Sequence, residues 1–228
     1  MYQRWAKLLF LHWEVPVEEL APMLPPGLTL DTFEGRAYVG LVPFTMTGVR
    51  PLWFPRFPPL TDFHETNVRT YVHREGADPG VWFFSLDAGN PLAVRVARAM
   101  WRLPYHRSRM SMRIEGPWVD YALDRLWPPP IPAHLRIRYR AIGPVTPAKP
   151  GSLEHFLAER YLLYAYRDGQ LYRGRVHHAP YPLQTAEIEG LEETLLSAAG
   201  IRRPDAPPLM HYASELNVRI YPLRTVTP

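Results

Sequence analysis

The sequence predicts an α+β fold of mostly antiparallel strands, a curved sheet or β-barrel with a few short helices. Many short apolar or alternating segments are separated by turn residues, and helical periodicity is confined to a few stretches. Aromatic residues, which favour strands, make up 13% of the chain. Because no shift in composition marks a boundary, we expect one domain over residues 1–228.

The first half of the chain is expected to consist of strands interrupted by turns. Helical turns are expected over residues 17–24, ended by Pro25-Pro26-Gly27, and over 92–102, ended by Pro104. The proline-rich stretch 51–59 is expected to be a loop. The predicted strands are residues 8–15, 28–33, 36–46, 65–74 and 81–87.

The second half continues the same pattern. Asp168-Gly169 indicates a tight hairpin turn. Ser152 is expected to cap a short helix that ends at Leu157, and a further helix over residues 191–199 is expected to stop at Gly200. The predicted strands are residues 109–115, 119–126, 135–142, 160–167, 171–178, 185–188 and 212–221.

Composition excludes several classes of protein. Cysteine is absent, which excludes disulfides and thiolate chemistry and fits a reducing cytoplasm. The net charge is +4, but the arginines are scattered among acidic residues, so we expect no nucleic-acid partner. No apolar stretch is long enough to cross a membrane, and no membrane partner is expected. Lys7 and Lys149 are the only lysines, and this arginine bias with 27 prolines is typical of a GC-rich, heat-adapted genome.

Motifs for common cofactors and metals are missing from the sequence. It contains no G-x-S-x-G, P-loop or G-x-G-x-x-G motif, which argues against a serine hydrolase, an NTPase and a Rossmann fold. The histidines show no metal-ligand spacing, and His177 and His178 point to opposite faces of a strand. We therefore expect neither a metal nor a cofactor.

A repeated pattern, E-x-N-V-R-x-Y, is the most informative local feature. It occurs at residues 65–71 and again at 215–221. Because side chains alternate along a strand, the Glu, Asn, Arg and Tyr of each copy share one face. That face either meets water, as in an ordinary antiparallel sheet, or lines an interior where charged groups direct hydrogen bonds at a polar ligand.

The chain resembles the YqjF-like family of uncharacterised proteins and, less closely, the acetoacetate decarboxylase-like superfamily. The stretches that carry the resemblance are Leu24-Pro25-Pro26-Gly27-Leu28 to Asp31, Phe63 to Val72, Gly80 to Asp87, Leu103-Pro104-Tyr105, Glu159-Arg160-Tyr161 and His178 to Gln184. The resemblance implies the curved sheet and a polar pocket.

In the decarboxylases a helix is followed by Pro-Lys-Lys, and one lysine forms a Schiff base with the substrate. Here Tyr105 and His106 occupy the lysine positions, and neither side chain can form an imine. The resemblance also implies that Glu65 matches a glutamate that orients the lysine, and that Tyr38 stands at a second acidic position.

These residues suggest an unidentified small-molecule ligand and acid-base chemistry on a carbonyl or carboxylate compound. Glu65 or His106 would act as general acid or base, and Tyr105 would donate a hydrogen bond to a developing oxyanion. The predicted substrate-binding residues are Arg69, Arg219, Glu215, Tyr38, Asp87 and His178.

Several alternatives remain at this point. His106 also fits a surface position after a helix end, and Asp87 also fits a cap or turn before the helix at 92–102. The chain as a whole also fits a binding protein without catalysis, or an interaction module in which Trp53-Phe54 and Phe57 contact a partner. A homo-oligomer is left open.

Overall fold

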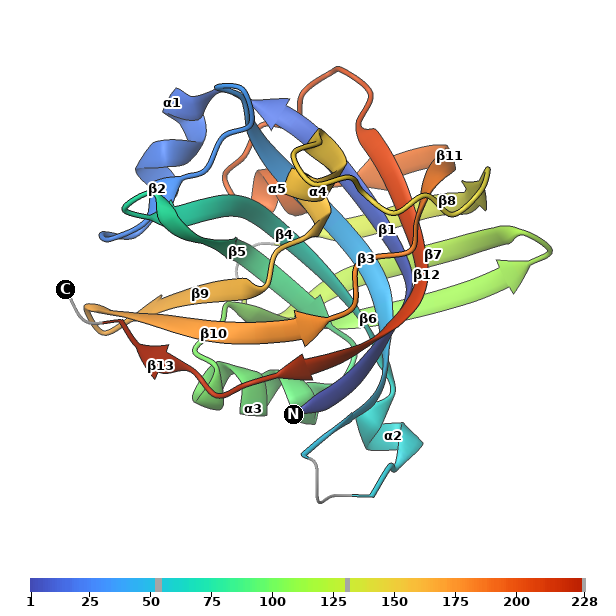
Figure 1. Ribbon diagram of the computed structural model, residues 1–228. Coiled ribbons are helices and arrows are strands. Elements are labelled where there is room, and N and C mark those ends of the chain that lie inside the picture. The colour runs from blue at the N-terminus through green and yellow to red at the C-terminus, as the bar shows by residue number, and fades with distance from the viewer. Residues whose placement is uncertain (52–54, 130–131, 227–228) are drawn as a thin grey trace.

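The computed structural model describes residues 1–51, 55–129 and 132–226 (Figure 1). The strands are β1 (Tyr2–Val15), β2 (Thr29–Leu30), β3 (Ala37–Arg50), β4 (Phe63–Arg74), β5 (Ala77–Ala88), β6 (Tyr105–Glu115), β7 (Trp118–Trp127), β8 (His134–Ile142), β9 (Leu162–Arg167), β10 (Gln170–His178), β11 (Leu183–Glu193), β12 (Leu209–Ile220) and β13 (Arg224–Thr225). The helices are α1 (Val17–Leu20), α2 (Pro58–Thr61), α3 (Pro91–Met100), α4 (Leu153–Ala158) and α5 (Leu195–Ala198), with a 3-10 turn at Ala21–Met23.

The predicted fold class is confirmed, because the strands form one curved sheet of mostly antiparallel pairs and the helices are short. The predicted Asp168-Gly169 turn joins β9 to β10, and both residues have the positive φ that such a turn requires. The Ser152 hydroxyl accepts a hydrogen bond from the His155 N–H at 3.3 Å, which confirms the cap of α4.

Strands β5 and β12 fork, and the forks close the sheet into two rings. One edge of β5 pairs first with β9 and then with β6, and one edge of β12 pairs with β11 and then with β10. The large ring runs through β4, β5, β6, β7, β8, β11, β12, β1 and β3. The small ring runs through β4, β5, β9, β10, β12, β1 and β3.

The strands shared by both rings form a wall that is covered on both faces. In β1, Leu9 and Leu11 pack in the core of the large ring, whereas Leu8 and Phe10 pack in the core of the small ring. This explains why residues 8–11 are an unbroken apolar run rather than an alternating one. Each ring therefore has its own hydrophobic core.

Close backbone contact between β5 and β9 helps to close the small ring. A Cβ on Gly80 would lie 2.8 Å from the carbonyl oxygen of Leu162, which is nearer than Cβ atoms approach such an atom. The two strands pair in parallel at Val81 and Leu163. Because Gly80 has no side chain, β5 and β9 can approach each other closely here, and a larger residue would push the two strands apart.

The expectation of a helix over residues 191–199 is wrong in its first part. Strand β11 continues to Glu193, and only Leu195–Ala198 is helical. A register shift between Glu189 and Leu191, with Gly190 at positive φ, marks a β-bulge, and the strand continues through it to Glu193. The predicted loop at 51–59 also overlaps α2, which begins at Pro58.

Within the described residues, no helix combines the length and apolar character needed to cross a membrane.

Candidate functional site

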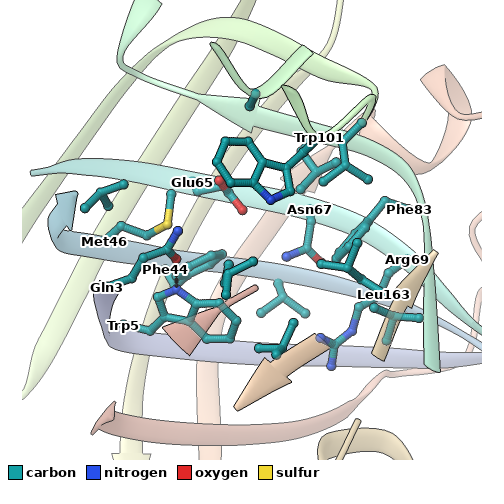
Figure 2. Close-up of a pocket in the computed structure, with 18 of the residues that line it drawn as sticks. Gln3, Trp5, Phe44, Met46, Glu65, Asn67, Arg69, Phe83, Trp101 and Leu163 are labelled. Atoms are coloured by element: carbon teal, nitrogen blue, oxygen red, sulfur yellow. Dashed lines mark hydrogen bonds between the residues drawn. The ribbon is translucent and has the colours of Figure 1, made fainter. Parts of the chain in front are cut away.

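A partly open cavity of about 150 Å³ lies inside the small ring (Figure 2). A cavity of this size, lined by apolar groups, can hold a molecule as large as benzene. The walls come from β1, β3, β4, β5, β6, β9, β10 and β12, and one side is covered by Val96 of α3 and by Trp101, which follows this helix. Most lining side chains are apolar, for example Phe44, Phe83 and Leu163, so the few polar ones determine what can bind.

Strand β4 supplies the main polar groups of the cavity. Glu65, Asn67 and Arg69 alternate along it, line the cavity and are buried. Val68 points the other way into the core of the large ring. The first copy of E-x-N-V-R-x-Y therefore lines an interior rather than meeting water.

Glu65 is held in a protonation state that is unusual for a carboxyl group. The Tyr105 hydroxyl donates a hydrogen bond to its Oε2 at 2.8 Å. Burial raises the pKa of Glu65 to about 8; the hydrogen bond from Tyr105 opposes this rise, and the nearby charge of Asp87 adds to it. At neutral pH the carboxyl group is thus mostly protonated, and it can donate a proton to a bound molecule.

Arg69 provides a buried positive charge at another point of the cavity wall. Its Nη2 donates to the carbonyl oxygen of Leu157 at 3.1 Å, and the guanidinium lies 5.5 Å from the ring of Phe10. A Cβ on Gly40 would lie 3.4 Å from Cγ of Arg69 and 3.0 Å from the ring of His12, so the glycine leaves room for both side chains. In the described part of the chain, no carboxylate pairs with Arg69.

Three polar atoms of cavity-lining residues are buried without a hydrogen-bond partner among the described residues. They are Oδ1 of Asn67, Nε of Arg69 and Nε1 of Trp101. Buried polar groups are nearly always paired, so three unpartnered atoms around one cavity indicate a surface adapted to a polar ligand. The set offers one acceptor and two donors.

His106 does not reach the cavity, although Tyr105 does. The two residues are neighbours on β6, so their side chains point to opposite faces. His106 lies beside Arg125 and Asp87; burial, followed by the charge of Arg125, lowers its pKa to about 4. The structure therefore brings Glu65 and Tyr105 together but leaves His106 apart.

Asp87 also lies behind the cavity wall rather than in it. Its carboxylate forms a buried two-point ion pair with Arg125, at 2.8 Å and 2.6 Å, and accepts a hydrogen bond from Ser108 at 2.7 Å. The alternative role as a helix cap is wrong, because Asn90 caps α3 by accepting from the N–H groups of residues 92 and 93. Asp87 acts on Glu65 only through its charge.

Tyr38 and His178 are buried near the cavity but do not line it. Tyr38 packs against Phe156 with ring centroids 6.3 Å apart. His178 makes tilted ring contacts with Tyr161 and Tyr181, with both centroid distances 4.7 Å, and its Nδ1 faces the carbonyl oxygen of Ala179 at 2.8 Å.

The second copy of the repeated pattern faces solvent. Glu215 and Arg219 are exposed, and Glu215 pairs with Arg4 on the neighbouring strand. Leu216 and Val218 occupy the inward face. The prediction that Glu215 and Arg219 lie in the interior is therefore wrong, because in this part of β12 the alternate, apolar side chains point inward.

Other functional residues were not singled out from the sequence. Asn67 belonged to the repeated pattern, so its shared face with Glu65 would have identified it. Arg160 also lines the cavity and stood in one of the stretches that carry the family resemblance, whereas Trp101, which follows α3, and Gln3 carried no local signal. Of the residues of the alternative interaction surface, Phe57 is 53% exposed, whereas Trp53 and Phe54 lie outside the described residues.

No lysine belongs to the cavity wall in the described part of the chain. Lys7 lies in β1 and Lys149 is on the surface. Nor do the described residues contain a group of three or more His, Asp or Glu side chains that could hold a metal ion.

Comparison with solved structures supports the fold. An enduracididine biosynthesis enzyme, MppR, complexed with the condensation product of pyruvate and imidazole 4-carboxaldehyde, matches with a TM-score of 0.68 and 12% identity, over 98% of this chain and 88% of that one. An acetoacetate decarboxylase from Legionella pneumophila matches with a TM-score of 0.62 and 15% identity, over 99% and 87%. An acetoacetate decarboxylase-like enzyme from Sphingomonas wittichii gives 0.65 and 13%, over 99% and 92%.

Comparison of sequences places the chain in a family. The uncharacterized protein YqjF of Bacillus subtilis (strain 168) is 40% identical over 224 residues, which cover 98% of this chain and 91% of that protein. The model of the DUF2071 family, described as an uncharacterized conserved protein, matches residues 2–221. The chain, with its acetoacetate decarboxylase-like fold, therefore belongs to the DUF2071 family.

Proposed function

We propose that the cavity binds a small, mainly apolar carbonyl or carboxylate compound and that Glu65 exchanges a proton with it. The observation that carries this proposal is that one face of β4 holds two unusual groups. One is the protonated carboxyl group of Glu65, and the other is the guanidinium of Arg69, which lacks a carboxylate partner among the described residues. The Cα atoms of Glu65 and Arg69 are about 13 Å apart along an extended strand, a span that suits one small molecule between their side chains.

Each polar group has a role in this proposal. Arg69 binds the carboxylate or a carbonyl oxygen of the ligand through its unpartnered Nε. In the fraction of molecules in which Glu65 is ionised, its carboxylate takes the proton from the carbon beside the carbonyl; the carboxyl group so formed exchanges that proton with solvent and returns one to the same carbon. The Tyr105 hydroxyl stabilises the carboxylate form through its hydrogen bond, and Arg69 stabilises the negative charge that develops on the ligand oxygen. Asn67 and Trp101 orient the ligand from the sides.

The relatives support this class of ligand. The MppR structures contain pyruvate or a condensation product of pyruvate, which are carbonyl compounds with a carboxylate. The reaction proposed here proceeds without a lysine imine, because Tyr105 and His106 stand where the decarboxylases have lysines. Neither Lys7 nor Lys149 lines the cavity.

Proton exchange at the carbon beside a carbonyl tests the proposal directly. A panel of 2-oxo acids and ketones is screened by calorimetry, and proton NMR in D₂O then follows loss of the signal from that carbon. We expect Glu65→Gln to abolish exchange while it retains binding, and Arg69→Met to weaken carboxylate binding by about tenfold or more.

The second copy of the repeated pattern provides matched controls. Glu215→Gln and Arg219→Met change the same residue types on the solvent face, so they should alter neither binding nor exchange. If binding depends on Arg69 but no exchange occurs, the protein would instead be a binding protein without catalysis. This alternative is favoured by the absence of His106, the other expected acid or base, from the cavity wall. Binding unaffected by both cavity substitutions would refute the proposed site.

A further inference from the structure

A second hollow, here called the α3 groove, lies on the side of α3 that faces away from the cavity. It has a volume of about 770 Å³, within the range of sites for small molecules. Arg95, Arg98 and Arg102 line the α3 groove, whereas Val96 and Trp101 line the cavity. The two sites adjoin at Phe83 and Leu103, which line both, but these arginines lie only in the groove, so an inference about the groove does not rest on the proposed function.

The α3 groove is strongly basic. Arg95 and Arg98 lie one turn apart on one face of α3, Arg102 follows the end of the helix, and Arg167 joins them from the end of β9. No acidic residue belongs to the described lining. The nearest carboxylate, Asp168, lies 3.5 Å from Arg102 and 3.6 Å from Arg167 and is 76% exposed, so solvent screens it.

Two of the guanidinium groups lack a carboxylate partner. In the described part of the chain, neither Arg95 nor Arg98 forms an ion pair. Arg98 is nevertheless fixed in place, because its Nη1 donates to the carbonyl oxygen of Tyr105 at 2.7 Å and it lies 5.1 Å from the ring of Trp127. A cation held in advance loses little entropy when it binds an anion.

Aromatic rings complete the lining of the α3 groove. The lining includes the rings of Trp82, Trp127 and Tyr166. Trp127 is 44% exposed, so its ring is accessible to a ligand. Such rings bind planar groups by stacking, and convergent guanidinium groups match the oxygens of a phosphate better than those of a single carboxylate. The two features together describe a ligand that carries both a phosphate and a planar ring.

Positive charge continues beyond the groove only over a short distance. On β6, Arg107, which pairs with Trp127 across the strands, and Arg109 are exposed and form no ion pair among the described residues. On β8, by contrast, Arg136, Arg138 and Arg140 are each paired with acidic side chains of the neighbouring strands. A nucleic acid needs a longer basic stripe than this, so the pattern favours a small ligand.

We propose that the α3 groove binds a small phosphorylated ligand with a planar ring, such as a nucleotide. The phosphate lies among Arg95, Arg98 and Arg167, and the ring stacks against Trp127. The proposal adds a site for a small molecule that is distinct from the cavity.

Calorimetry with four probes tests this site: ADP, AMP, inorganic phosphate and adenosine. We expect ADP and AMP to bind more tightly than phosphate or adenosine alone. Arg95→Gln and Arg167→Gln should each weaken ADP binding by about tenfold, the loss of one charge-assisted contact. Arg113→Gln is the matched control: this arginine is 79% exposed on β6, outside the α3 groove, and its loss should leave binding unchanged.

Two further measurements separate this site from the alternatives. Glu65→Gln should bind ADP as the wild type does, which distinguishes the α3 groove from the cavity. A single-stranded oligonucleotide should bind no more tightly than AMP. The proposal is overturned if ADP does not bind, if the control weakens binding as much as Arg95→Gln does, or if the oligonucleotide binds more tightly.

Discussion

Because the pKa of Glu65 is raised, the stability of the fold should decrease as the pH rises. The pKa is about 8 in the folded chain against an ordinary value of 4.5, and burial is the main cause. Between these two values the folded chain keeps a proton that the unfolded chain has released, so the free energy of unfolding falls with pH. At about 1.4 kcal/mol per unit of pKa difference, the free energy of unfolding falls by about 5 kcal/mol between these two pH values.

Substitution by glutamine isolates this effect. The amide of Glu65→Gln matches the protonated carboxyl in shape, and its oxygen can accept the hydrogen bond from Tyr105. Urea unfolding of both proteins should give similar free energies near pH 5, whereas at pH 9 the variant should be more stable by about 5 kcal/mol. Glu65 is 4% exposed, so solvent screening does not reduce the effect.

The comparison removes the contributions of other groups. Burial lowers the pKa of His12 and His106, which makes stability fall as the pH drops below about 6.5, but both histidines are present in both proteins. The exposed Glu215→Gln serves as the control and should show no pH-dependent difference from the wild type. Parallel pH curves for wild type and Glu65→Gln would refute the assignment of a raised pKa to Glu65.

Three further substitutions test the surroundings of the site, each by urea unfolding. Tyr105→Phe removes a hydrogen bond that favours the charged carboxylate, so the pKa of Glu65 should rise further and the fall in stability should continue to higher pH than in the wild type. Asp87→Asn leaves Arg125 buried without its partner and should cost about 3–5 kcal/mol; a loss below 1 kcal/mol would contradict a buried ion pair. Gly80→Ala should cost about 1–3 kcal/mol, because the new Cβ meets backbone.

Gly89→Ala is the control for Gly80→Ala. Atoms near a Cβ at this position begin at 3.8 Å, an ordinary contact distance, so its stability should change by less than about 0.5 kcal/mol. Equal losses in the two variants would refute the close contact between β5 and β9 as the cause of the cost.

Local signals in the sequence were sufficient to predict much of the fold. The turn at Asp168-Gly169, the cap at Ser152 and the alternation of β4 depend on residues close together in the chain. The absence of lysine near Pro104 likewise showed that a lysine imine was not available at this position. The helix expected from residue 191 was wrong at its start, because β11 continues through a bulge at Gly190 and local sequence does not show whether a strand resumes after such a glycine.

Only the tertiary structure decided which polar face became a site. The two copies of E-x-N-V-R-x-Y have the same local pattern, yet Glu65 and Arg69 line a cavity while Glu215 and Arg219 meet water. Alternation determines which side chains share a face, but burial depends on what packs against that face. Strand β4 is enclosed by both rings, whereas beyond its pairing with β11 the strand β12 belongs to the small ring alone, so its other face is left to solvent.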